Sequence, residues 1–197
     1  MKKRILSLLL ALVMLATLLP LGLYDTAWAA EVSETAEAAE IASGSCGAGG
    51  VEDSSVRWVL TDDGTMTISG TGAMCDRETP WRDFSSQINR VVIESGVTTV
   101  GSYAFSNCDN LTAAELPGTL TAIGDYAFAW SNVAEITIPD GVVTIGAGAF
   151  QETKLVDVVI PDSVTTIGAG AFWENEACRC GHPGQCDDHW GERIPLL

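Results

Sequence analysis

Apolar and polar positions recur with a fixed period over the second half of the chain. Four segments of equal length align without gaps, at residues 88–105, 111–128, 133–150 and 155–172. They end in Phe105, Phe128, Phe150 and Phe172, at spacings of 23, 22 and 22 residues. A period of this size predicts a solenoid, because one repeat has too few apolar residues to close a core alone and stacked repeats share one.

Each segment contains two short runs that favour strands. In the first run apolar and polar residues alternate, which predicts a strand with one buried face. Pro117, Pro139 and Pro161 end this run in the later three segments. A glycine follows the second run, where the chain must turn tightly, and Ala-Phe then begins a brief helical or 3₁₀ segment. Successive coils are expected to stack their strands in parallel.

Equivalent side chains of stacked coils form columns, and the apolar columns are the predicted core. A fully buried aliphatic or aromatic side chain contributes roughly 1.5–3 kcal/mol, so most of the stability is expected there. The columns start in the first segment at Ile88, Val91, Ile93, Val97, Val100 and Phe105 and continue at the equivalent positions of the later segments.

Residues 46–87 precede the repeats and predict a separate capping unit. Two β-prone runs, residues 56–60 and 65–69, are joined by residues 62–64 (Asp-Asp-Gly), which are a hairpin turn signal. The polar stretch at residues 80–87 is expected to form one or two helical turns.

Residues 1–29 have the three parts of a secretory signal peptide. A basic start at residues 2–4 leads into an apolar run that ends near Leu23, and residues 27–29 (Ala-Trp-Ala) have the form of a cleavage site. Cleavage after this motif is expected, although the run is long enough for an uncleaved membrane anchor. Residues 30–45, rich in Ala, Glu and Ser, predict a linker or a short frayed helix, because they bury too little apolar surface to offset their ordering entropy.

The chain is strongly acidic, with a formal net charge of −16. Cleavage removes three basic residues and one acidic residue, which moves the charge to −18. Such a surface repels phosphate backbones, so nucleic acid is excluded as an expected partner.

The pattern L-x-x-V-x-I-P-x-x-V-x-x-I-G-x-x-A-F resembles the repeat of the BspA-like leucine-rich repeat family of bacterial surface proteins. The cap, with Trp58, Pro80-Trp81 and residues 64–74, is similar to the unit that often precedes such repeats. The resemblance covers about residues 46–173. It implies a mainly β solenoid of leucine-rich-repeat-like coils of about 22 residues, with parallel strands and short helical turns, preceded by a β-hairpin capping unit. It also implies adhesion or protein binding and no shared catalytic residues.

Six cysteines are present: Cys46, Cys75, Cys108, Cys178, Cys180 and Cys186. Export places them where disulfides can persist, but their connectivity does not follow from sequence. Cys46 and Cys75 flank the hairpin, and a disulfide between them is one open possibility. Cys108 is expected to be a small buried apolar residue.

An irregular tail, residues 174–197, follows the four repeats of residues 88–173. A fifth coil in register would point Cys180, His182, Cys186 and His189 inward, a set suited to a structural zinc cap. A disulfide among the tail cysteines, or a tail that pairs with nothing, is the stronger expectation, because the spacing matches no standard zinc pattern. No metal or cofactor is therefore predicted.

The expected function is that of a secreted or cell-surface module, monomeric and without catalytic residues, that binds a protein or cell-surface ligand. No lipid-anchor motif or wall-attachment module is recognised. The alternative is a structural spacer, or a remnant of a larger surface protein, with no ligand of its own. Solenoids bind partners on the exposed faces of their strands. The outward strand positions proposed for binding are Arg90, Val92, Glu115, Glu135, Thr137, Asp157 and Val159.

Overall fold

The structure is a computed structural model that describes residues 38–77, 79–156 and 158–175. These residues belong to one compact unit that begins at Ala38. The predicted signal peptide, most of the predicted linker and the Cys/His-containing tail lie outside the described residues. Among the described residues, no helix is long and apolar enough to cross a membrane.

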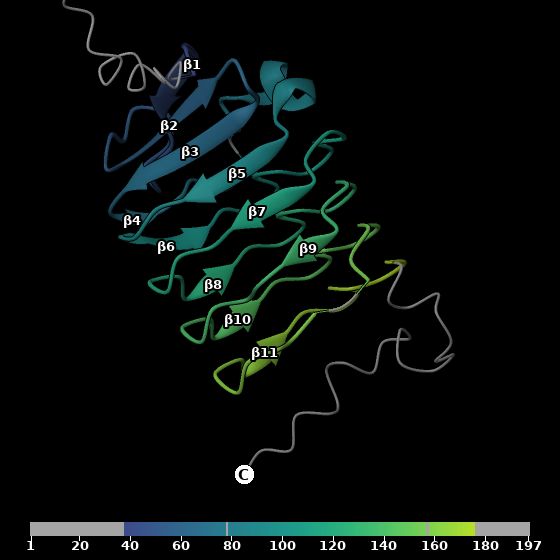
Figure 1. The fold of residues 1–197 in the computed structure, drawn as a ribbon. Helices are drawn as coiled ribbons and strands as arrows, with labels where there is room; N and C mark the ends of the chain where they lie inside the picture. The colour runs from purple at the N-terminus through teal and green to yellow at the C-terminus, as the bar shows by residue number, and fades with distance from the viewer. Residues whose placement is uncertain (1–37, 78, 157, 176–197) are drawn as a thin grey trace, which may run out of the picture. The chain divides into compact units, whose positions relative to one another are not determined.

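Two sheets run along the stack of coils (Figure 1). The first sheet contains, in spatial order, β1 (Glu40–Ser45), β2 (Val56–Thr61), β3 (Thr65–Gly70), β5 (Arg90–Ile93), β7 (Ala113–Glu115) and β9 (Glu135–Ile136). The second contains β4 (Gly72–Ala73), β6 (Val97–Val100), β8 (Ala122–Ile123), β10 (Thr144–Ile145) and β11 (Thr166–Ile167). Each coil therefore crosses from one sheet to the other.

The strands of successive coils are parallel and in register, as the repeat period predicted. In the first sheet Val91 of β5 pairs with Ala114 of β7, which pairs with Ile136 of β9. In the second sheet Ile123 and Ile145 are paired in the same way. Among the described residues of the fourth segment, β11 forms but no strand of the first sheet does, so the two-strand pattern is complete in three segments only.

The hairpin of the cap is present as predicted. Antiparallel β2 and β3 pair Leu60 with Met66, and the turn between them places Gly64 at a φ of 81°. One carboxylate oxygen of Asp63 accepts hydrogen bonds from the hydroxyl of Thr61 (2.7 Å) and the N–H of Thr65 (2.9 Å). These bonds stabilise the charged carboxylate and hold the pKa of Asp63 below its ordinary value, the Thr61 hydroxyl contributing most.

Residues 40–45 differ from the linker prediction, because they form β1 at the edge of the first sheet. The strand is held by main-chain pairing with β2, which needs few apolar side chains. Gly44 lies opposite Trp58, and a Cβ at Gly44 would come within 2.8 Å of the indole Nε1 of Trp58. The small residues that suggested a linker therefore allow β1 to lie against Trp58.

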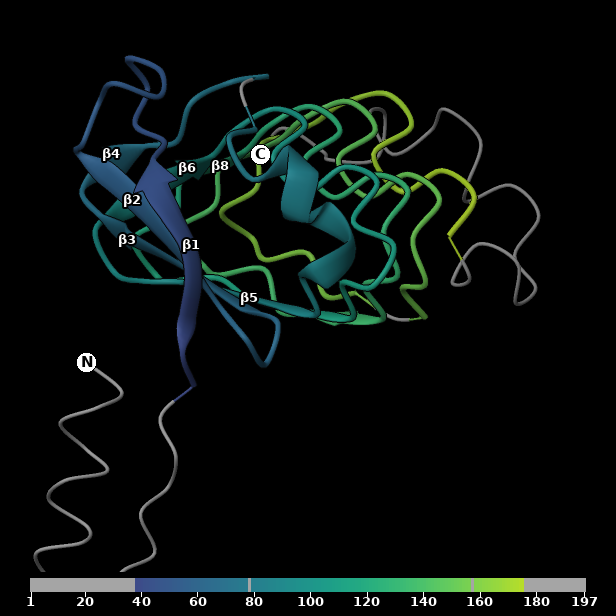
Figure 2. The same cartoon turned by 90° about the horizontal axis from the view of Figure 1, so that it is seen from above.

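The third side of each coil is a series of turns rather than the predicted helical or 3₁₀ segment. The N–H groups of Phe105, Phe128 and Phe150 donate to carbonyls one coil further on, at 2.7–2.8 Å. The N–H groups of Ala104, Ala127 and Ala149 donate to carbonyls three residues back in their own coil, so single turns of this kind alternate with the ladder and no regular helix forms. Among the described residues the one regular helix is the 3₁₀ helix η1 (Arg82–Gln87) of the cap, within the stretch predicted to be helical, and it lies across one end of the stack (Figure 2).

Left-handed backbone recurs at two positions of every coil. At the second position Asn107, Trp130, Glu152 and Glu174 have φ values of 53–58°. At the first position Tyr103, Tyr126, Gly148 and Gly170 have φ values of 63°, 53°, 59° and 66°. Glycine adopts this conformation without strain, whereas tyrosine does so at some cost. The first two coils therefore carry a tyrosine where the last two carry a glycine.

A stack of aromatic rings runs through the core from the cap to the last described coil. Phe105, Phe128, Phe150 and Phe172 stack with ring centroids 5.3–5.5 Å apart. Trp81 extends the stack into the cap, 5.5 Å from Phe105, and Trp58 meets Trp81 edge-on at 5.9 Å. The phenylalanine column was predicted, but its continuation into the cap was not.

The predicted aliphatic columns also form the core. Their members are buried except for Leu116, Val158 and Ile160, which are partly buried and pack against the rest. Two of these three residues, Val158 and Ile160, belong to the fourth segment.

Cys46, Cys75 and Cys108 are all buried. Burial, with a smaller contribution from the nearby carboxylate of Asp109, raises the pKa of the Cys108 thiol to about 12. Burial, with a contribution from neighbouring Cys75, raises the pKa of the Cys46 thiol to about 12 as well. The N–H of Cys75 donates to the carbonyl of Cys46 at 2.8 Å, so their main chains are adjacent, and a disulfide between them stays a prediction.

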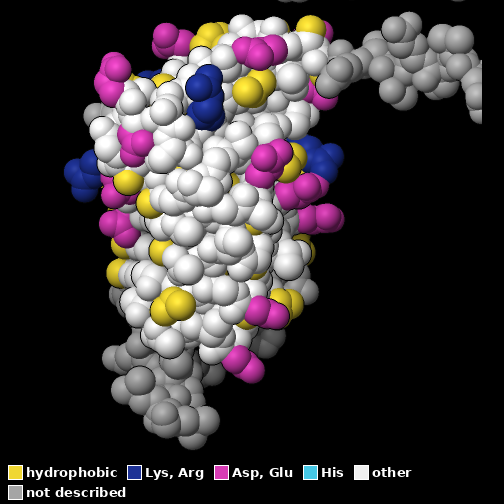
Figure 3. Space-filling view, turned by 90° about the vertical axis from the view of Figure 1, so that its left-hand side faces the viewer, with side chains coloured by type: hydrophobic (Ala, Val, Ile, Leu, Met, Phe, Trp, Pro, Cys, Tyr) yellow, Lys and Arg dark blue, Asp and Glu magenta, His cyan; other side chains and the backbone are white. Residues whose placement is uncertain are grey.

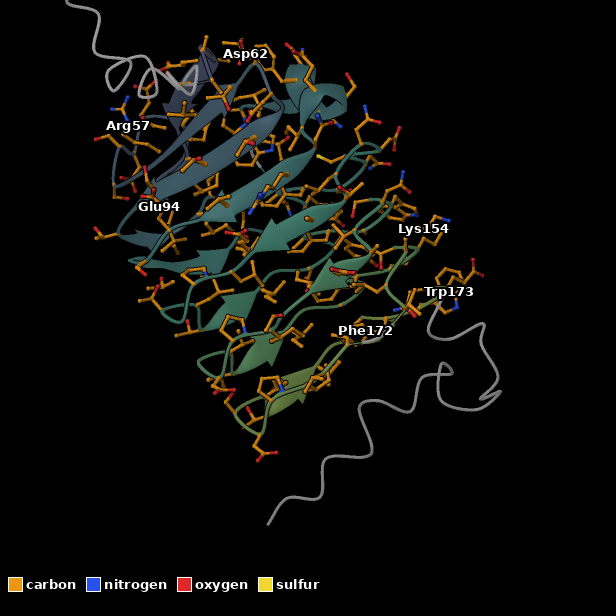
Figure 4. The ribbon with its side chains drawn as sticks, viewed as in Figure 1. Arg57, Asp62, Glu94, Lys154, Phe172 and Trp173 are labelled. Atoms are coloured by element: carbon orange, nitrogen blue, oxygen red, sulfur yellow. The ribbon has the colours of Figure 1, made fainter. Side chains whose placement is uncertain are left out.

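Truncation within the ring stack is expected to destabilise the fold strongly. Phe128→Ala removes a fully buried ring stacked on both sides and should lower the free energy of unfolding by about 3–5 kcal/mol, measured by urea denaturation. The matched control is Trp173→Ala, because the Trp173 side chain is 45% exposed beside buried Phe172 (Figure 4). A Phe128→Ala effect no larger than that of the control would contradict the stack as a main source of stability.

The Cys108 thiol is expected to be unreactive in the folded protein. At about pH 8 iodoacetamide should spare Cys108 until urea is added, because the buried thiol, with its raised pKa, stays protonated. The pKa of the Cys108 thiol is about 12 in the folded protein and near its ordinary 9.0 in the unfolded one. At pH values between about 9 and 12 the folded state therefore binds more protons than the unfolded state. Stability should therefore fall as the pH rises above about 9. Rapid labelling of the native protein, read by mass spectrometry, would show that the site opens.

Candidate binding site

The predicted binding residues lie on the outward side of the first sheet. Along β5 the buried Val91 and Ile93 alternate with exposed Arg90 and half-buried Val92. Exposed Glu115 ends β7, and exposed Glu135 begins β9. Thr137 and Val159 are also exposed, Val159 with 78% of its surface accessible. Asp157 lies outside the described residues. These outward positions are called the strand face below.

The charges of the strand face partly neutralise one another. The guanidinium of Arg90 on β5 forms an ion pair with the carboxylate of Glu115 on β7, and both side chains are about half exposed (52% and 55%). Exposed pairs of this kind add little stability. Among the described residues of the strand face, Glu135 is then the carboxylate that this ion pair does not neutralise, so the centre of the face is close to neutral.

The strand face continues onto the cap, which sequence analysis did not anticipate. Parallel pairing of β3 with β5 aligns Thr65 with Arg90 and Thr67 with Val92. On β2, exposed Arg57 and half-buried Val59 follow the same alternation. The alternation in residues 56–69 contained this signal, but the pairing that joins the hairpin to the coils has no local signature. The surface is thus one continuous face from β2 to β9.

A pocket of about 430 Å³ lies on the turn side of the cap and first coil. Its walls come from the segment between β4 and η1, from η1 itself and from the turns of the first two coils. The lining residues include Arg77, Trp81, Arg82, Tyr103, Asn107 and Trp130. Sequence analysis missed this pocket, because its residues come from separate segments and none stands out alone.

No group of three or more His, Cys, Asp or Glu side chains within the described residues is arranged to hold a metal ion. Both histidines, together with Cys180 and Cys186, lie outside the described residues. Acidic side chains are spread over the face shown in Figure 3, with fewer Lys and Arg side chains among them.

Comparison with known proteins identifies the repeats. The sequence profile of the BspA type leucine rich repeat region matches residues 83–179 in six copies, a finer division than the four segments aligned above. No curated protein matches the chain.

Three solved structures illustrate the similarity. A leucine-rich repeat protein from Eubacterium ventriosum is 32% identical over 67% of this chain and 41% of its own, with a TM-score of 0.54. A leucine-rich repeat protein of T. pallidum is 31% identical over 60% and 64%, with a TM-score of 0.43. A leucine rich cell surface protein from Faecalibacterium prausnitzii is 21% identical over 63% and 54%, with a TM-score of 0.27. This chain spans less than two thirds of each.

The profile and the Eubacterium structure agree with the solenoid of parallel coils described above. Residues 83–179 are therefore a leucine-rich repeat region of BspA type, and this part of the chain belongs to the BspA-type leucine-rich repeat family.

Proposed function

We propose that this protein is an extracellular binding module that holds a protein ligand against its strand face. Leucine-rich repeats of BspA type are a protein-interaction fold, and proteins that carry them are typically secreted or displayed on the cell surface. The signal-peptide features of residues 1–29 support export. The family is generally non-catalytic, and the proposal assigns no reaction to the chain.

The observation that carries the proposal is the continuity of the strand face across cap and coils. The first sheet joins the hairpin to the coils without a break, and its outward side chains mix charged, hydroxyl and apolar groups. Protein interfaces have this mixed composition. Val59, Val92 and Val159 supply apolar surface, and Thr65, Thr67 and Thr137 supply hydroxyls beside them.

The strand face alone is smaller than a standard interface. Five strands about 4.8 Å apart and about four residues long cover roughly 300 Å² in the plane of the sheet. A standard interface buries about 800 Å² on each partner. A partner of ordinary affinity is therefore expected to contact the loops that flank the strands as well.

Photo-crosslinking locates the binding surface even while the partner is unidentified. A benzophenone amino acid placed at Val92 or Thr137 should form adducts with a protein from a cell-surface extract. The same group at Asp140, an exposed position outside the strand face, should not. Adducts from Asp140 alone would move the surface elsewhere. Absence of adducts from all three positions would favour a spacer without a ligand.

Charge reversal on the strand face is expected to weaken binding of the partner so identified. Glu135→Lys should lower the affinity by about tenfold or more, because it reverses the charge of the strand-face carboxylate that the Arg90–Glu115 ion pair leaves unneutralised. The matched control Asp140→Lys makes the same change in charge and should leave the affinity unaltered. Calorimetric titration measures both, and equal affinities for the two variants would contradict the assignment.

A further inference from the structure

The pocket on the turn side is a second surface of the protein, separate from the strand face. It lies where the cap follows the turn ladder of the coils only in part. The N–H of Arg77 donates to the carbonyl of Ser102, as that of Tyr103 donates to the carbonyl of Asp125 one coil further on. After this hydrogen bond the cap forms the 3₁₀ helix η1 in place of a turn. A hollow of about 430 Å³ lies between this part of the cap and the first coil.

Two arginines line this hollow in an otherwise acidic protein. Arg77 and Arg82 are two of the five Lys or Arg residues within the described ranges, and no Asp or Glu is among the residues that line the pocket. Within those ranges neither guanidinium has a carboxylate within salt-bridge distance. The neighbouring carboxylate of Asp76 is turned to the N–H of Ser102, at 2.7 Å. As far as the described residues go, the pocket therefore offers positive charge that no carboxylate neutralises.

The position of Arg77 is fixed by its surroundings. Its backbone is left-handed, with a φ of 61°, and its guanidinium lies 5.9 Å from the ring centroid of Tyr103. The other ring contact of Tyr103 is Tyr126, at 5.1 Å. A cation held against an aromatic face loses less freedom when it binds an anion, because its side chain is already ordered.

The aromatic residues of the pocket offer carbon surface rather than N–H donors. The indole N–H of Trp130 is donated to the carboxylate of Glu152 at 2.9 Å, and that of Trp81 to the carbonyl of Ala104 at 2.8 Å. Trp130 is half-buried, and its ring lies parallel to that of Tyr126 at 5.8 Å. A ligand in the pocket would meet the flat ring atoms of Trp130.

The first coils differ from the later ones at the positions that build this site. Tyr103 and Tyr126 occupy the left-handed position that is glycine in the third and fourth coils. A Cβ at Gly148 would lie 2.4 Å from the ring of Tyr126, so glycine there makes room for the tyrosine. The ring of Tyr103 contacts the guanidinium of Arg77, and the ring of Tyr126 contacts that of Trp130. The two tyrosines therefore help to order two of the residues that line the pocket.

Small polar groups complete the lining. Thr79, Ser85, Ser106 and Asn107 line the pocket, and the amide of Asn107 donates to the hydroxyl of Ser106 at 2.9 Å. The set therefore combines two guanidinium groups, one flat aromatic surface and several hydroxyl and amide groups.

We propose that this pocket binds a carboxylated sugar ring, as found in the acidic units of anionic glycans. Guanidinium groups bind carboxylates through paired, charge-assisted hydrogen bonds. The C–H face of a sugar ring is an apolar patch that packs against the negatively polarised face of an indole. Ring hydroxyls find partners in the serine, threonine and asparagine side chains. The volume suits one or two sugar units, within the usual range of about 300–1,000 Å³ for ligand pockets.

Two other anionic ligands fit less well. A phosphate would use the arginines and the hydroxyl groups but would leave the aromatic surface without a partner. An acidic peptide segment carries its carboxylates on flexible side chains, which lose more freedom on binding than the substituents of a rigid ring. The carboxylated sugar uses every kind of group in the lining.

Matched sugars test the proposal directly. The methyl glycosides of glucuronic acid, galacturonic acid and sialic acid are titrated into the full protein, with the neutral methyl glucoside and galactoside as counterparts. Binding is followed by calorimetry and by tryptophan fluorescence. At least one acidic sugar should bind in the millimolar range or tighter, about tenfold or more above its neutral counterpart, and the difference should shrink in high salt.

Variants assign the binding to the pocket. Arg77→Gln and Arg82→Gln should each weaken acidic-sugar binding by about tenfold, and Trp130→Ala should weaken it without changing the salt dependence. The control Arg57→Gln makes the same change on the hairpin, outside the pocket, and should bind like the unaltered protein. Circular dichroism verifies that each variant is folded. Glu135→Lys on the strand face should also leave sugar binding unchanged, which separates this site from the proposed protein-binding surface.

The opposite results would overturn the proposal. Failure of all three acidic sugars to bind, equal binding of acidic and neutral sugars, or Arg77→Gln and Arg82→Gln variants that bind normally would each do so. Tighter binding of inorganic phosphate or of an acidic peptide than of any sugar would assign the pocket to that ligand instead. Free glycosides and long glycan chains are then compared, because preference for the chain would show that a polymer is the natural source of the ring.

Discussion

The ring of Phe128 lies between those of Phe105 and Phe150, at 5.3 and 5.5 Å. Its N–H is donated to the carbonyl of Ala149, one coil further on. Both contacts run along the stack, from one coil to the next, and the strand pairings of the two sheets do the same. A coil of this protein has almost no core of its own, so its stability depends on its neighbours. The cap matters for the same reason, since Trp58 and Trp81 continue the ring stack that would otherwise begin at Phe105.

The sequence was informative wherever a structural feature follows the period. The phenylalanine column, the parallel register and the second-sheet strands were all predicted from spacing, because identical neighbours must occupy identical positions. Features outside the period were missed. Trp81 precedes Phe105 by 24 residues and comes from a different local structure, so spacing alone did not place it in the column.

Main-chain hydrogen bonding accounts for the other differences between the predicted and the observed structure. Ala-Phe is compatible with a helical or 3₁₀ segment, and only the donation of N–H groups to the next coil shows that single turns form instead. Strand β1 was expected to be a linker, because its side chains are small and polar, whereas its pairing with β2 is made by backbone atoms. Of the candidate sites, the strand face followed from alternation, while the pocket depends on which distant segments meet in space.

The strand face and the pocket both depend on residues that lie outside the repeated pattern of the coils. The strand face is continuous because the hairpin joins the sheet in register. The pocket lies where η1 of the cap takes the place of a turn and where tyrosine stands at a position that is glycine in the later coils. In both cases the cap does more than close the end of the core, because it contributes residues to the surface that a ligand would meet.

The central claim is that cap and coils form one cooperative unit through the ring stack. Amide hydrogen exchange of the protein and of its Trp81→Ala variant tests this most directly. The account predicts that loss of the Trp81 ring speeds exchange at the amides of Phe105 and also, one coil further on, at Phe128, because each coil is stabilised by the one before it. Faster exchange confined to the cap, with Phe105 and Phe128 as protected as before, would contradict it.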